Sequence, residues 1–169
     1  MVKVSEVMIH DVHHCRAVDP MTRPAQIMWE RDCGCVPVTD DGGEVVGMIT
    51  DRDLAMAAYT SGKPLGSLKV GDAMAPDPVA CSSEEGVEEA LQQMSEAQVR
   101  RLPVVDGDRH LVGIVSMTDL IQKAKGTKTS PWTRNLVESM AHITMPRSLF
   151  PGMGHSDRAT SEVRSHMVP

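Results

Sequence analysis

Two short segments of this chain place a hydroxyl side chain three residues before an aspartate. They are Gly47-Met48-Ile49-Thr50-Asp51-Arg52-Asp53 and Gly113-Ile114-Val115-Ser116-Met117-Thr118-Asp119, 66 residues apart. Each follows an apolar run and precedes a helical pattern, so the hydroxyl and the carboxylate fall at a strand-to-helix turn. A carboxylate there can accept two hydrogen bonds from the adjacent hydroxyls of a sugar. The hydroxyl can join free backbone N–H groups in holding a phosphate.

The same spacing has a purely structural interpretation. Thr or Ser three residues before Asp is also a capping box, with Asp in place of the commoner Glu. Capping alone contributes roughly 1 kcal/mol and needs no ligand. The two turns also differ, because Arg52 adds a fixed positive charge to the first and Thr118 stands at the matching place in the second. We therefore favour the turn of Thr50, Arg52 and Asp53 as the ligand site.

These turns belong to an internal repeat. A shift of 66 residues aligns the chain with itself without a gap from Lys3 to Ala58, which places Pro37-Val38 on Pro103-Val104 and Asp53-Leu54 on Asp119-Leu120. Most positions that differ carry similar residues. The pattern indicates a duplication, so each copy must fold in the same way.

Each copy predicts the order β-α-β-β-α. The helix of the second copy has apolar residues at Val87, Ala90, Leu91 and Met94, which is the stripe of an amphipathic helix. In the first copy Thr22 is the predicted N-cap, which leaves Pro24 in the first turn. The predicted strands are near 13–18, 36–38 and 45–49 in the first copy and near 79–81, 102–105 and 111–115 in the second. Helices are predicted over about 51–60 and 117–125.

One copy holds too little core to fold alone, so two copies must pack together. We expect an α/β fold in which the two units form one body with pseudo-twofold symmetry and two related clefts. The predicted organisation is a first repeat (1–60), a linker (61–69), a second repeat (70–125) and a tail (126–169). In the tail a stripe of Trp132, Leu136, Met140 and Ile143 predicts a short helix over 132–143, and the chain from Met145 onward is expected to be flexible.

Composition excludes several classes of function. The chain has 169 residues, a formal net charge of -6 and 2% aromatic residues, which argues against nucleic acid as a partner. It has no apolar run of the length that a membrane helix needs, and its first residues do not resemble a signal peptide. Its four cysteines do not form a disulfide framework, so we expect reduced thiols and a cytoplasmic protein. No motif for catalysis is present, so we expect no enzyme.

The ordered motifs resemble a tandem pair of cystathionine-beta-synthase (CBS) domains, the regulatory unit called a Bateman module. The resemblance spans roughly residues 2–125. It includes Val4-Ser5-Glu6-Val7-Met8 and Val70-Gly71-Asp72-Ala73-Met74, Cys35 to Asp40 and Arg101 to Asp106, and the two Thr/Ser-x-x-Asp turns. The resemblance implies a sensor that binds an adenine nucleotide (AMP, ADP or ATP, sometimes S-adenosylmethionine), pairs as a homodimer and requires no cofactor.

The resemblance also implies roles for particular residues. Asp53 and Asp119 would bind ribose, and Thr50, Arg52 and Ser116 would contact phosphate. The adenine would occupy an apolar slot, lined in one cleft by His14, Cys15, Cys35, Val36 and Pro37 and in the other by Val79, Ala80, Arg101, Leu102 and Pro103. The protein that such a sensor would regulate is not identified by the sequence.

Two alternatives from other classes stay open. One is a ligand-free dimerisation module that acts as a scaffold. The other is a metal- or redox-responsive protein that uses His13, His14, Cys33 and Cys35, since imidazole and thiolate are ligands for zinc and copper. The spacing of these four residues matches no standard zinc motif. Cys15 and Cys33 also occupy packing positions of the repeat, which favours a structural role.

Overall fold

The computed structural model describes residues 1–125 and 131–144. It contains two sheets and five helices in those ranges. The first repeat holds β1 (Cys15–Arg16), α1 (Thr22–Arg31), β2 (Cys35–Thr39), β3 (Val45–Thr50) and α2 (Asp51–Ser61). The second holds β4 (Ala75–Pro76), β5 (Cys81–Ser82), α3 (Val87–Ala97), β6 (Arg101–Val105), β7 (Leu111–Ser116) and α4 (Met117–Lys125), and α5 (Pro131–Thr144) follows.

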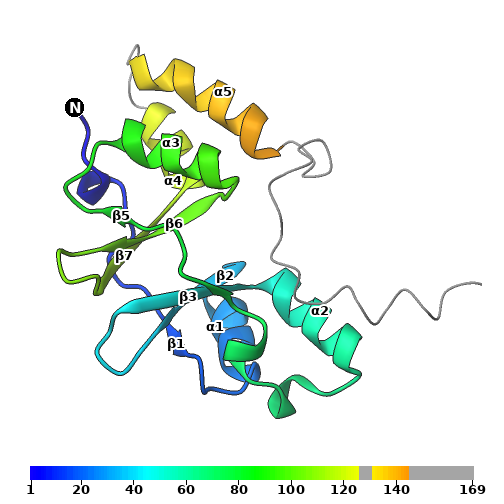
Figure 1. The fold of residues 1–169 in the computed structure, drawn as a ribbon. Helices are drawn as coiled ribbons and strands as arrows, with labels where there is room; N and C mark the ends of the chain where they lie inside the picture. Colours follow the sequence, from blue (N-terminus) through cyan, green and yellow to red (C-terminus); the bar gives the residue numbers. More distant parts are fainter. Residues whose placement is uncertain (126–130, 145–169) are drawn as a thin grey trace, which may run out of the picture.

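The predicted β-α-β-β-α order is confirmed in both repeats, and so is the α/β fold class. In each repeat a two-residue strand pairs in parallel with the next strand, which pairs antiparallel with the third. The shift of 66 residues holds in the register, because Cys15 pairs with Val38 and Cys81 pairs with Val104. Figure 1 shows the two halves one above the other, with α3 and α5 above the upper sheet and α1 below the lower one.

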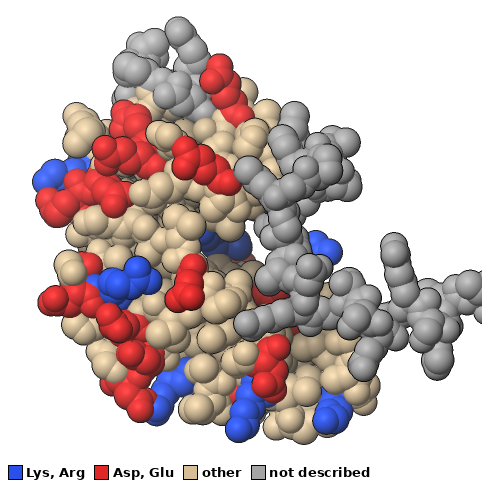
Figure 2. All heavy atoms as spheres, viewed as in Figure 1, with Lys and Arg blue, Asp and Glu red and all other residues tan. Residues whose placement is uncertain are grey.

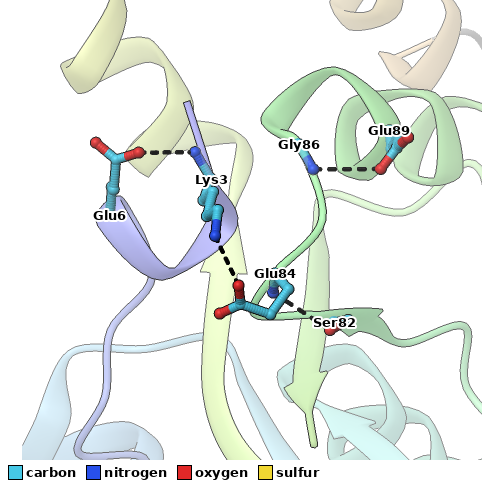
Figure 3. Close-up of polar contacts among 6 residues, drawn as sticks. All are labelled: Lys3, Glu6, Ser82, Glu84, Gly86 and Glu89. Carbon is cyan, nitrogen blue, oxygen red and sulfur yellow. Dashed lines mark hydrogen bonds and ion pairs between the residues drawn. The ribbon is translucent and has the colours of Figure 1, made fainter. Parts of the chain in front are cut away.

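The opening segment of each repeat packs on the sheet of the other repeat. In the first repeat, Val4 N donates to Glu85 O over 2.9 Å, and Ile9 exchanges two backbone hydrogen bonds with Ile114 of β7. Lys3 Nζ also lies 2.7 Å from Glu84 Oε2, and Figure 3 shows this contact beside the Gly86–Glu89 cap of α3. The matching segment of the second repeat forms β4, which pairs with β3. This exchange was not predicted, and it joins the two halves.

Two hydrophobic cores result, one in each half. Val70 from the second repeat is fully buried in the core of the first half, and Val4 from the first repeat is fully buried in the core of the second. Burial of each valine contributes about 1.5 kcal/mol or more. The hairpins of the halves also meet, where Val45 N donates to Arg109 O and Leu111 N donates to Gly43 O, each over 3.1 Å.

Helix α5 breaks the pseudo-twofold symmetry. It packs against α3 and α4, and it buries Trp132, Leu136 and Ile143 in the core of the second half. The helix lies where the apolar stripe predicted one. The flexible end expected from Met145 onward lies outside the described residues.

Two local predictions were wrong. Thr22 is not the N-cap of α1, because Met21 precedes it in a helical conformation and the cap position makes no side-chain hydrogen bond. Met21 is fully buried and its N–H donates to Leu68 O, so the chain enters the helix one residue earlier than the polar residue suggested. The strand expected over 13–18 is shorter, since the carbonyl of Ala17 accepts from Gly71 N.

Candidate functional site: the paired helix-start turns

Both turns form the capping box that the spacing allowed. Thr50 is the N-cap of α2, and its Oγ1 accepts from Asp53 N over 3.2 Å. Asp53 Oδ2 in turn accepts from Thr50 N over 2.8 Å and from Thr50 Oγ1 over 2.6 Å. Ser116 and Asp119 repeat this geometry with distances of 3.3, 2.8 and 2.6 Å. The turns are therefore nearly identical in their backbones.

Each capping carboxylate keeps one oxygen outside the box. All the hydrogen bonds to Asp53 and Asp119 within residues 1–125 and 131–144 involve Oδ2, which leaves Oδ1 of each without a partner there. Both side chains are half-buried. The cap thus fixes the orientation of each carboxylate, and its remaining oxygen can accept hydrogen bonds from a ligand. Binding of ribose by these residues stays a prediction.

The two turns differ in charge. Asp51 and Arg52 in the first turn correspond to Met117 and Thr118 in the second. Asp51 Oδ1 accepts from Arg52 N over 2.7 Å, at the positive end of the α2 dipole. Only the first turn therefore combines a guanidinium with free N–H groups at a helix start.

Several residues expected to line the adenine slot lie elsewhere. Cys15, Val36 and Leu102 are at most 2% exposed, so their side chains belong to the two cores. His14 Nδ1 lies 2.8 Å from Thr39 Oγ1, at the hairpin end of the sheet. Pro37, Pro103 and Cys35 are buried too, whereas Val79 is 46% exposed and Ala80 is half-buried.

Arg101 was expected in the second cleft, and the structure corrects this. Its backbone starts β6 opposite Ser116, but its guanidinium reaches the first repeat. Burial raises the pKa of the Cys35 thiol, and the nearby Arg101 charge opposes this shift without cancelling it. The two side chains occupy equivalent positions in the repeats, so they meet where the halves face each other.

The match to a known family follows this duplicated geometry. The CBS domain model matches residues 4–59 and 70–126, so both helix-start turns fall inside a match. This chain belongs to the CBS domain family. As a CBS pair, it consists of two such domains in tandem.

Relatives of this CBS pair include both sequences and solved structures. The uncharacterized protein YlbB of Bacillus subtilis is 37% identical over 121 residues, which span 71% of this chain and 80% of YlbB. The crystal structure of CBSX2 in complex with AMP has a TM-score of 0.66 and 25% identity, and it covers 76% of this chain and all of that chain (100%). The crystal structure of Hypoxic Response Protein I with two coordinated zinc ions has a TM-score of 0.65 and 29% identity, over 72% of this chain and 98% of that one.

The CBS pair also has a cavity that the sequence did not predict. It has a volume of about 330 Å³ and lies between the two hairpins. Its lining includes His10, Asp11, His14 and His110, but neither Asp53 nor Asp119. The three histidines are far apart in the sequence and only the exchange of opening segments brings them together, so no local pattern could have identified the cavity.

The metal-site alternative is not supported by the geometry. Throughout residues 1–125 and 131–144, no three His, Cys, Asp or Glu side chains are arranged to hold a metal ion, so His13, His14, Cys33 and Cys35 do not converge. The four cysteines are free thiols. Burial raises the pKa of Cys15 and of Cys81 to about 12, which makes both unreactive near neutral pH. None of the described helices is long and apolar enough to span a bilayer.

Proposed function

We propose that this CBS pair is a non-catalytic regulatory module that binds an adenine nucleotide at the first-repeat turn. The observation that carries the proposal is the free carboxylate oxygen of Asp53 beside Arg52, at the N-terminus of α2. A carboxylate oxygen suits the ribose hydroxyls, and the helix N-terminus with Arg52 suits a phosphate. The AMP complex of CBSX2, a protein of the same fold, supports this choice of ligand class.

The proposed mechanism is a shift between conformations or partner affinities. A ligand changes such an equilibrium only when it binds one state more tightly than the other. The two halves here share their cores through Val4 and Val70, so a ligand at the first turn acts on a body in which each half is held by the other.

Calorimetry with AMP, ADP, ATP and S-adenosylmethionine tests the proposal. We expect Asp53→Ala to abolish measurable binding and Asp119→Ala to preserve it. Because alanine also removes a helix cap, Asp53→Asn serves as a control that keeps an acceptor oxygen but loses the charge. Equal losses in the two alanine variants would overturn the preference for the first turn. No binding by the wild-type protein would overturn the nucleotide proposal.

A second candidate function is association of two copies, which an exposed aromatic surface favours. Trp29 on α1 is 89% exposed and Tyr59 on α2 is 68% exposed. The corresponding helices of the second half are covered by α5, and Ser95, the repeat partner of Trp29, contacts His142 of α5. We therefore propose a homodimer through α1 and α2. Sedimentation of Trp29→Ser should show a shift to monomer, whereas Val137→Ser on the exposed side of α5 should not.

A further inference from the structure

The side chain of Arg101 crosses from the second repeat to the first. The Cβ position of Gly34 lies 3.8 Å from Arg101 Nη1 and 3.2 Å from Asp51 Oδ2, so both groups occupy the same side of Gly34. The Cys35 thiol lies close enough to feel both charges. Arg101 is an exposed residue, and Figure 2 shows Lys or Arg atoms in the recess between the two halves.

This guanidinium is not neutralised by a close ion pair. Within the part of the chain that the structure describes, no salt bridge joins Arg101 to Asp51 or to any other carboxylate. Asp51 instead uses Oδ1 to accept from Arg52 N. An arginine has five N–H donors, so Arg101 retains donors for an additional anionic group.

The arrangement exists in one cleft only. At the position equivalent to Arg101 the first repeat has Cys35, and at the position equivalent to Asp51 the second has Met117. The first turn therefore has Arg52 from its own repeat and Arg101 from the other, with the Asp51 carboxylate next to them. The second turn receives neither Arg52 nor the reaching guanidinium.

We propose that Arg101 contacts the phosphate of a nucleotide bound at the first-repeat turn, and that Asp51 opposes this contact. The inference rests on the proposed function. It makes the ligand a bridge between the repeats, with the ribose on Asp53 and the phosphate partly on a side chain of the second repeat. Asp51 attracts Arg101 in the absence of ligand and repels the phosphate, so it sets how strongly the phosphate adds to affinity.

The test compares adenosine with AMP by calorimetry, because the ratio of their affinities isolates the phosphate. One charge-assisted hydrogen bond gives about a tenfold change in affinity. We expect Arg101→Gln to weaken AMP by about tenfold with adenosine unchanged, and Asp51→Asn to strengthen AMP several-fold with adenosine again unchanged. Arg100→Gln is the matched control, since Arg100 is the neighbouring exposed arginine.

Each outcome bears on the inference. Opposite effects of Arg101→Gln and Asp51→Asn on the AMP-to-adenosine ratio, with no effect of Arg100→Gln, would support it. An unchanged ratio in Arg101→Gln, or equal changes in Arg101→Gln and Arg100→Gln, would overturn it while leaving the proposed function intact. Absence of binding of both adenosine and AMP to the wild-type protein would overturn the proposed function, and this inference with it.

Discussion

The glycine of each repeated turn motif should tolerate no side chain, because the opening segment of the other repeat lies against it. A Cβ on Gly113 would lie 2.7 Å from Met8 Sδ and 3.0 Å from the carbonyl oxygen of Ile9. Met8 is flexible, but the Ile9 carbonyl is hydrogen-bonded to Ile114 N over 3.0 Å and cannot withdraw without breaking that bond. We therefore expect Gly113→Ala to cost about 1–3 kcal/mol of unfolding free energy.

The assay is urea denaturation followed by circular dichroism, with Gly107→Ala as the matched control. A Cβ on Gly107 would meet no atom within 4 Å, and its backbone has no positive φ. That variant should be neutral or more stable by about 0.5 kcal/mol, because alanine restricts the unfolded chain. In a Met8→Ala background, the cost of Gly113→Ala should fall, since one of the two overlapping atoms is gone.

If Gly113→Ala were as harmless as Gly107→Ala, the opening segment could not lie over β7 in solution. The exchange of segments between the halves would then be wrong, together with the shared cores. A large loss in both variants would instead indicate that the second hairpin tolerates no alanine. The explanation by contact with Met8 and Ile9 would then fail.

Three further predictions concern stability. Trp132→Ala should cost about 3 kcal/mol or more in urea denaturation, because this side chain is 1% exposed, whereas Trp29→Ala should stay within about 0.5 kcal/mol for the isolated subunit. Thr50→Ala should cost about 1 kcal/mol through loss of the α2 cap, with the same measurement. Burial raises the pKa of the Cys15 and Cys81 thiols from 9.0 to about 12 in the fold, so the unfolded chain loses these protons first. The free energy of unfolding should therefore fall between about pH 9 and 12, by up to about 1.4 kcal/mol per pH unit for each thiol, and alanine at both positions should flatten that slope.

The features that the sequence predicted well are local ones. Amphipathic spacing located α3 and α5, and the Thr/Ser-x-x-Asp spacing located the starts of α2 and α4. These elements depend on neighbours within a few residues, so a single chain segment contains the relevant information. The duplication then gave the order of elements twice.

The features that the sequence missed depend on contacts between distant segments. β4 is two residues long and pairs with β3, while Ile9 forms a single bridge to Ile114, so neither has enough length for a periodic pattern. The direction of the Arg101 side chain likewise follows from how the halves pack. The residues assigned to an adenine slot were placed by resemblance, and burial shows that three of them, Cys15, Val36 and Leu102, are core residues.

Duplication separates the requirements of the fold from those of the site in this molecule. Positions that both halves need for folding have kept their residue types: Gly47 and Gly113 under the crossing segments, and Asp53 and Asp119 in the caps. Positions at the rim of the turns have not, since Asp51, Arg52 and Cys35 correspond to Met117, Thr118 and Arg101. A scaffold without a ligand would have no physical reason to concentrate charge differences beside the two caps. The asymmetry is instead what a pair of clefts needs when one of them binds an anionic ligand and the other does not, and the comparison of Asp53→Ala with Asp119→Ala measures that difference directly.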